Sequence, residues 1–263
     1  MFTALTLLLV PTALKAQTTV TIGDESSGVT AYILPVNMYF NYSLTQQIYT
    51  AEEINMPDGG TITAISFDYA STGAFSVDGI EVYMKNVSKD HFESSTDMVE
   101  VSSSDRVFSG DFSASGAGWA TITLDAPFHY DGTSNLLVCL YDPTEGYPGN
   151  TYTFRCTSTG NNSSDPKLAV TYNSDTYIPD LSNIHTYQGG KALQTYRSNI
   201  RLTINPDIAD IYITGFTPPI WNGQPTIILN TPTSDPYSVK TSLCIWQDVT
   251  NNPANIFTGY VFN

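Results

Sequence analysis

The sequence predicts an all-β protein: a jelly-roll-like β-sandwich followed by an incomplete immunoglobulin-like β module. Helical periodicity of the i, i+3, i+4 kind is almost absent from the 263 residues, whereas alternation of apolar and polar residues with a period of two recurs throughout. Gly, Asn, Asp and Pro bound the alternating segments. About ten strands of ordinary length within roughly 190 residues are typical of a sandwich or jelly roll, and a barrel is the alternative.

The first 16 residues are expected to be a secretory signal peptide. Residues 2–16 form a short apolar block that ends on Ala16, before a Thr- and Ser-rich sequence begins at Gln17. The block is too short to span a bilayer and has the character of the hydrophobic part of a signal, with cleavage after Ala16. A buried N-terminal strand is the alternative interpretation.

In the first 105 residues, short strands are expected between turn residues. The expected strands are Thr18–Ile22, Val29–Leu34, Gln46–Tyr49, 65–69, 80–84 and a short edge strand at 99–101. Thr50-Ala-Glu-Glu53 has the form of a capping box and predicts one helical turn through Ile54. Ser71–Ser76 has the length of a hairpin connection between two of these strands.

The second half of the first domain continues the same pattern. Its expected strands are Val107–Phe112, Ala120–Leu124, Leu136–Tyr141, Leu168–Tyr172 and Ile200–Ile204. Leu136–Tyr141 is the most apolar run after the leader, so we expect it at the centre of the fold, with Trp119 in core or inter-strand packing. Asn205-Pro-Asp closes a domain that we place at residues 17–206.

Residues 207–263 have a different pattern, in which short strands are separated by Pro-rich turns. This pattern suggests an immunoglobulin-like module, and the segment is shorter than the roughly 100 residues that such a sandwich needs. We therefore expect a partial domain at 207–263. The first domain is expected to be a monomeric module of a larger multidomain chain.

The charge of the chain bears on the class of partner. The net charge is −15, from 25 acidic and 10 basic residues. Nucleic acids and anionic membrane surfaces both need a cationic face, so we expect neither nucleic-acid binding nor membrane insertion. An excess of carboxylates fits bound cations better.

Calcium is the cation that these carboxylates would suit, because it takes six to eight hard oxygen ligands, many of them from loops. The candidate ligands are Asp24 and Glu25, which follow the first strand, and Asp131, which lies in an Asp-Gly turn. Asp142 and Glu145 follow the central strand. The sequence has no EF-hand pattern, and the alternative is that each Asp simply forms its turn.

Two aromatic loops are candidates for ligand binding. The first follows the central strand, and its candidate residues are Asp142, Tyr147, Asn150 and Tyr152. The second has Tyr39, Phe40 and Tyr42 around Asn41. Aromatic planes stack on the C–H faces of sugars while Asp and Asn bond their hydroxyls, so such loops suit a glycan, or a peptide. The alternative is that these rings pack as ordinary strand residues.

Cys139 and Cys156 lie symmetrically about the first of these loops. If the flanking strands form a symmetric hairpin, the two residues face each other, and an exported chain permits a disulfide between them. The alternative is two small buried side chains. Cys244 is left over, and there is no C-x-x-C pattern or Cys/His cluster for zinc.

No catalytic motif is visible. There is no G-x-S-x-G sequence, and His91, His129 and His185 are isolated from any recognisable nucleophile context. Paired carboxylates for glycoside hydrolysis depend on distances in space, but Glu52 and Glu53 belong to the capping turn. We therefore expect a non-enzymatic chain.

Several strings resemble a known group of proteins. T-V-T-I-G-D-E, T-Q-Q-I-Y-T-A-E-E-I, G-W-A-T-I-T-L-D-A-P-F-H-Y-D-G-T-S-N-L and S-N-I-R-L-T-I are similar to the repeated β-sandwich modules of secreted and surface proteins of Bacteroidetes. Those modules resemble the adhesin domains of gingipain-type proteins exported by type IX secretion, which are jelly rolls that can bind calcium. The resemblance covers most of residues 18–205. No sorting domain of the type IX kind is visible before Asn263.

These observations predict a secreted or outer-surface adhesion module that binds a glycan or an extracellular protein, with calcium as its only expected cofactor. The alternative is an accessory domain, for substrate targeting or spacing, of a secreted peptidase or glycoside hydrolase whose catalytic part lies in other sequence. A purely structural spacer is the third possibility.

Overall fold

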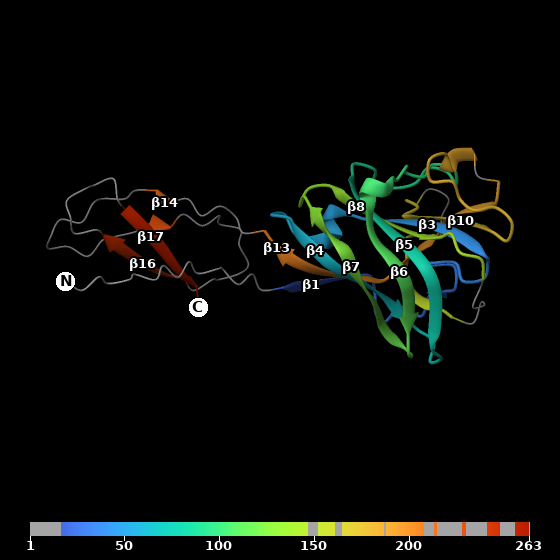
Figure 1. Cartoon of the computed structure of the whole chain (residues 1–263), viewed down its shortest axis with the longest axis horizontal. Helices are drawn as coiled ribbons and strands as arrows, with labels where there is room; N and C mark the ends of the chain where they lie inside the picture. The colour runs from blue at the N-terminus through green and yellow to red at the C-terminus, as the bar shows by residue number, and fades with distance from the viewer. Residues whose placement is uncertain are drawn as a thin grey trace, which may run out of the picture. The chain divides into compact units, whose positions relative to one another are not determined.

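A computed structural model describes residues 17–146, 152–160, 165–186 and 188–207, together with four strands in the C-terminal part. Ala16–Asp207 form one compact unit, and residues 208–263 belong to another. The regular secondary structure of the first unit is almost all β-strand (Figure 1). The segment expected to be a signal peptide, residues 1–16, lies outside the described residues.

Two antiparallel sheets build the first unit, which confirms the predicted all-β sandwich. The seven-stranded sheet, here called sheet A, contains β1 (Thr18–Ile22), β13 (Ile200–Pro206), β4 (Gly60–Tyr69), β9 (Phe154–Ser158) and β12 (Tyr196–Ser198), with β2 (Thr30–Ala31) on β9 and β7 (Gly118–Tyr130) on β4. The six-stranded sheet, sheet B, has the order β11 (Gly190–Gln194), β10 (Ala169–Ser174), β3 (Tyr42–Tyr49), β8 (Asn135–Asp142), β5 (Phe75–Val87) and β6 (Arg106–Ala114).

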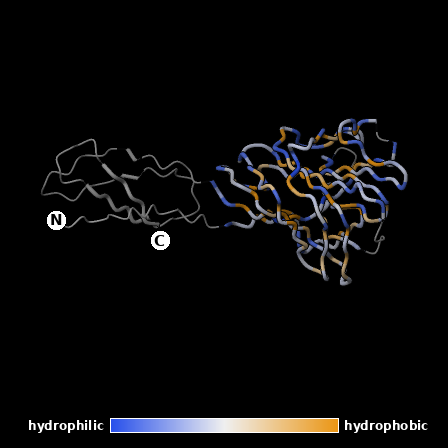
Figure 2. Tube along the Cα trace, in the orientation of Figure 1, coloured by the Kyte–Doolittle hydropathy of each residue, from blue (hydrophilic) through white to orange (hydrophobic). Residues whose placement is uncertain are grey.

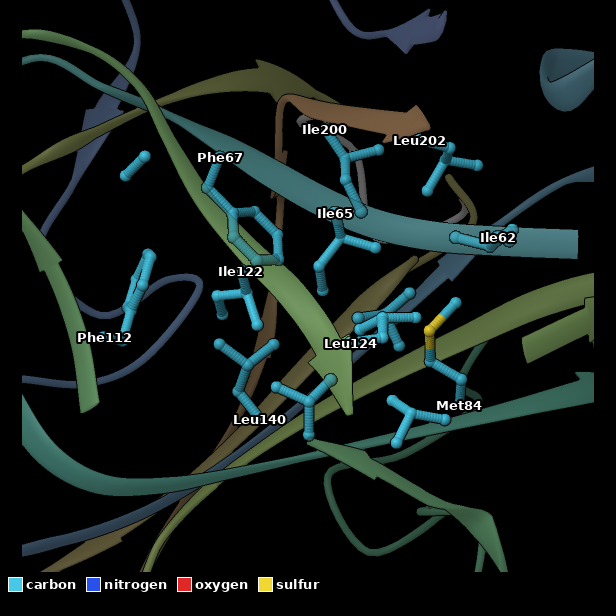
Figure 3. Close-up of a cluster of buried hydrophobic side chains, with 14 of the residues drawn as sticks. Ile62, Ile65, Phe67, Met84, Phe112, Ile122, Leu124, Leu140, Ile200 and Leu202 are labelled. Carbon is cyan, nitrogen blue, oxygen red and sulfur yellow. The ribbon is translucent and has the colours of Figure 1, made fainter. Parts of the chain in front are cut away.

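The main core lies between the two sheets and follows the two-residue alternation of the strands. Ile65 and Phe67 of β4 pack with Ile122 of β7 and Leu140 of β8 (Figure 3). Successive side chains of a strand point to opposite faces, so one face of each strand supplies this layer. Figure 2 shows hydrophobic residues recurring along the strands.

A second apolar cluster covers the outer face of sheet B. Leu137 and Cys139 of β8 pack there with Phe92, Met98 and Ile184 from the long loops 88–102 and 175–189. Both faces of β8 are therefore buried, which explains why Leu136–Tyr141 is apolar at every position instead of alternating.

The predicted helical turn is confirmed as α1 (Ala51–Ile54). The Thr50 side chain accepts from the Glu53 N–H, and the Glu53 carboxylate accepts from the Thr50 N–H, so both halves of the capping box form. Arg197 of β12 donates two bonds to the Glu53 carboxylate, at 2.6 and 3.0 Å. The helical turn is thereby joined to sheet A.

Two expected strands are wrong. The segment predicted at Val29–Leu34 is a strand only at Thr30–Ala31, because the chain then turns inward and buries Leu34 and Val36. Residues 99–101 form no strand. Instead the Gln46 side chain of β3 accepts from the Val99 N–H and donates to the Val99 carbonyl, so an amide side chain takes the place of strand pairing.

The connection at Ser71–Ser76 is not the expected hairpin. It leads from β4 in sheet A to β5 in sheet B. The link from β6 to β7 crosses from sheet B to sheet A in the same way. At the end of the sandwich where β4 and β6 finish, short connections thus pass from one sheet to the other and close that end.

The C-terminal unit is described through four strands. β14 (Ile213–Thr214) pairs with β15 (Ile228–Leu229), and β16 (Thr241–Gln247) pairs with β17 (Ile256–Phe262), both antiparallel. The rest of the expected immunoglobulin-like module lies outside the described residues.

Candidate functional site

The predicted loop after β8 is described at its two ends. Asp142 is the last residue of β8, and Tyr152 precedes β9. Tyr152 is partly buried against the main core, with its ring centroid 6.2 Å from that of Phe75. Tyr147 and Asn150 lie outside the described residues.

Asp142 is a buried carboxyl group. Its Oδ1 accepts from the N–H and the hydroxyl of Thr144, at 3.1 and 2.8 Å, whereas its Oδ2 is buried with no hydrogen-bond partner among the described residues. Burial raises the pKa of Asp142 to about 6, and the two bonds from Thr144 oppose this shift only partly. The residue starts the loop and is not displayed to solvent.

Strand register brings the second aromatic loop to the same end of the sandwich. β3 begins where β8 ends, with Ser43 opposite Asp142, and β10 ends opposite the start of β3, with Ser174 opposite Tyr42. Residues 32–42, 142–146 and 174–178 therefore meet at one end of sheet B. We call this end the aromatic end.

The exposed aromatic rings of the described residues gather there. The large hydrophobic side chains with more than 40% exposure are Tyr32, Tyr39, Tyr177 and Ile178. The Tyr39 ring centroid is 6.1 Å from that of Tyr32 and 5.3 Å from that of Phe40, with the rings edge to face in both pairs. No such side chain is exposed elsewhere in the part of the chain that the structure describes.

Hydrogen bonds hold the loops of the aromatic end to each other. The Asn41 N–H donates to the Asp175 carboxylate at 3.2 Å, and the Asn41 amide donates to the Asp175 carbonyl at 3.3 Å. The Ser174 hydroxyl accepts from the N–H groups of Thr176 and Tyr177. The exposed rings thus belong to loops that are joined by hydrogen bonds between Asn41 and Asp175.

This arrangement suits a ligand that has both apolar faces and hydroxyl groups. Tyrosine rings offer apolar planes with a polar tip, and Asn41 and Asp175 supply polar groups within the same surface. Sequence reasoning found Tyr39 and Phe40 but missed Tyr32, Tyr177 and Ile178. The available signal was a Tyr-Ile pair among the turn residues of 173–180, where no core strand is expected.

The candidate calcium ligands are not brought together. Asp24 and Glu25 follow the end of β1, which lies opposite the start of β13, whereas Asp131 follows the end of β7, near the end of β13. The Asp24 carboxylate accepts from Ser26, the Asp131 carboxylate accepts from Thr133 and Ser134, and Glu25 pairs with Arg201 at 2.9 Å. Within the described ranges, no group of three or more His, Cys, Asp or Glu side chains could hold a metal ion.

The expected disulfide between Cys139 and Cys156 is wrong. The hairpin that would align them does not form, because β8 pairs with β3 and β5 in sheet B whereas β9 belongs to sheet A. Both thiols are free and buried, and burial raises the pKa of each. They are the small buried side chains of the alternative interpretation.

Of the two expectations for Trp119, inter-strand packing is confirmed and a place in the core is wrong. Its neighbours Ala120 and Ile122 face the core, and Trp119 lies on the outer face of sheet A, with the Arg201 guanidinium carbon 4.0 Å from its ring centroid. This stacking leaves the indole ring half-buried, so one of its faces is covered by Arg201.

Comparison of this chain with protein-family models, with curated proteins and with solved structures finds no match. The helices of the described residues include none with the length and apolar character needed to cross a membrane.

Proposed function

We propose that this chain is a non-enzymatic extracellular binding module that recognises a glycan at the aromatic end. The observation that carries the proposal is the gathering of the exposed rings Tyr32, Tyr39 and Tyr177 on hydrogen-bonded loops at one end of the sandwich. Exposed apolar groups that cluster on a soluble domain are characteristic of interaction sites.

A glycan fits the chemistry of these groups better than an apolar partner does. The rings supply planes for stacking, while Asn41 and Asp175 supply groups that bond hydroxyls. These polar groups belong to the same loops as the rings, which favours a ligand that is itself mostly polar. Export, suggested by the leader at residues 1–16, would place the site outside the cell.

The first test is a glycan array probed with the full chain. We expect the wild-type chain to bind a subset of oligosaccharides, and we expect Tyr39→Ala combined with Tyr177→Ala to weaken that binding about tenfold or more, since tenfold corresponds to only about 1.4 kcal/mol. Isothermal titration with the best oligosaccharide measures the change.

Trp119→Ala is the matched control, because it removes a partly exposed ring from the outer face of sheet A. It should leave the affinity unchanged. If no oligosaccharide binds, or if Trp119→Ala abolishes binding while the double variant retains it, the aromatic end is not the ligand site.

A further inference from the structure

A groove lies at the opposite end of the sandwich from the aromatic end. It has a volume of about 300 Å³ and is bounded by β5, β6 and β7. The residues that matter for its chemistry are Lys85, Asn86, Arg106, Ala126, Phe128 and His129. Its position is set by the register of β5 and β8, in which Asn86 lies opposite Leu136 at the start of β8, and not opposite Asp142 at its end.

The groove separates two sheet edges. β6 is the last strand of sheet B, and β7 pairs with β4 alone. On the described part of these edges, the Ser109 N–H of β6 already donates to the Asp125 carboxylate of β7, at 2.9 Å. Edge strands offer main-chain groups to an extended peptide.

The rim of the groove presents cations, although the chain as a whole is strongly acidic. Two ion pairs and one histidine–carboxylate pair lie at the groove, and in each the basic side chain is about twice as exposed as its carboxylate. The exposed fractions are 40 and 18% for Lys85 and Asp105, 45 and 19% for Arg106 and Glu81, and 64 and 33% for His129 and Asp207. The carboxylates are recessed, so an approaching ligand meets the cations first.

Elsewhere on the described residues the pattern is mixed: Arg155 is more exposed than its partner Asp68, at 36 and 6%. In Arg201–Glu25 and Arg197–Glu53 the carboxylate is the more exposed partner. At the groove, two cations with recessed partners, Lys85 and Arg106, lie on the same rim. This rim complements an anionic ligand.

The wall and floor of the groove favour a peptide over a small ion. Phe128 and Ala126 give it an apolar wall. Asn86 donates through Nδ2 to the His129 carbonyl, while its Oδ1 is buried without a hydrogen-bond partner among the described residues. A buried acceptor without a donor has an energetic cost.

We propose that this groove docks an extended acidic peptide segment of a partner protein. The peptide lies along the edges of β6 and β7, its carboxylates meet Lys85 and Arg106, and a small apolar side chain lies against Phe128. This site is separate from the proposed glycan site, so either proposal stands or fails without the other.

The test is fluorescence anisotropy of the full chain with a labelled peptide of alternating Glu and Val, beside one of alternating Lys and Val. We expect only the Glu peptide to bind, and more weakly as salt rises. Lys85→Gln combined with Arg106→Gln should weaken its binding about tenfold, because each rim cation contributes a fraction of the total. Ala126→Trp, which fills the groove and leaves the charges in place, should also weaken it.

Lys191→Gln is the matched control, because it removes one cation from β11, at the far edge of the same sheet. Its affinity for the Glu peptide should equal that of the wild type. Equal binding of both peptides, or equal losses in Lys191→Gln and the rim variants, would overturn the proposal. So would sedimentation that shows a dimer in the wild type and a monomer in the rim variants, because the occupant would then be a second copy.

Discussion

Asp142 is the residue whose environment departs most from what its neighbours in sequence suggest. It was expected to face a ligand, and it is instead a buried carboxyl at the end of β8 with one oxygen lacking a partner. Its pKa is raised to about 6, so the folded state holds a proton that the unfolded chain releases near pH 4. Ionisation of this group therefore opposes folding above about pH 6.

Asp142→Asn should raise the free energy of unfolding above that of the wild type at neutral pH, and raise it by less at acid pH. Between about pH 4 and pH 6 the folded wild type binds more protons than the unfolded chain, so its stability falls as pH rises. A raised pKa of about two units corresponds to roughly 2–3 kcal/mol, which the Asn side chain avoids because it does not ionise. Urea unfolding of both proteins at pH 4.5 and pH 7.5 measures this difference.

Asp131→Asn is the control of opposite sign. Burial raises the pKa of Asp131, but hydrogen bonds from Ser134 and Thr133 outweigh this effect and lower the pKa below its usual value. The charge of Asp131 therefore stabilises the fold above about pH 4. This variant should lose stability at neutral pH and lose less at pH 3. An Asp142→Asn variant whose stability relative to the wild type does not change with pH would show that the Asp142 carboxyl is hydrated.

At the scale of elements, the joint between α1 and β12 depends on a buried charge. Arg197 is only 3% exposed, its guanidinium lies 4.3 Å from the Tyr49 ring centroid, and it donates to Glu53 and to the Ile48 carbonyl. Burial raises the pKa of Glu53, but the hydrogen bonds from Arg197 outweigh this effect, so the pKa of Glu53 is lowered. Without Glu53, the Arg197 charge would remain buried and uncompensated.

Glu53→Ala should therefore cost about 3–5 kcal/mol of unfolding free energy, the range for breaking a buried ion pair. Glu25→Ala is the matched control, because it removes the partner of Arg201, which is 33% exposed and hydrated after the loss. Its cost should stay below about 1 kcal/mol. Equal costs in urea unfolding would contradict the view that Arg197 depends on its partner.

The strands of the sandwich were predictable from sequence, but their connections were not. The alternation in 65–69, 80–84 and 200–204 identified β4, β5 and β13, because one face of each strand is buried. A short link gives no indication of whether it turns back in one sheet or crosses to the other. The links after β4 and β8 both cross, which is why the expected hairpins and the Cys139–Cys156 bridge were wrong.

The short pairing strands β11 and β12 were missed for a related reason. Residues 190–198 are polar and contain Gly190, Gln194 and Ser198, so no alternating pattern marks them. They are strands because β10 and β9 offer edges to pair with. Tertiary context, not local propensity, decides such segments.

For the whole molecule, the candidate site depends on how three loops converge. Local sequence identified Tyr39 and Phe40 as candidates, but only the antiparallel register of β3, β8 and β10 brings Tyr177 to the same end. The same register separates Asp131 from Asp24 and Glu25. Residues far apart in sequence form a site through the sheets, and periodicity within a strand carries no information about that.

The most direct test of the proposed glycan site is a chemical-shift map of the full chain with its best oligosaccharide from the array. If the aromatic end is the site, backbone amide shifts on titration will concentrate in residues 32–42 and 174–178. Shifts that concentrate on the outer face of sheet A, around Trp119 and Arg201, would contradict the account.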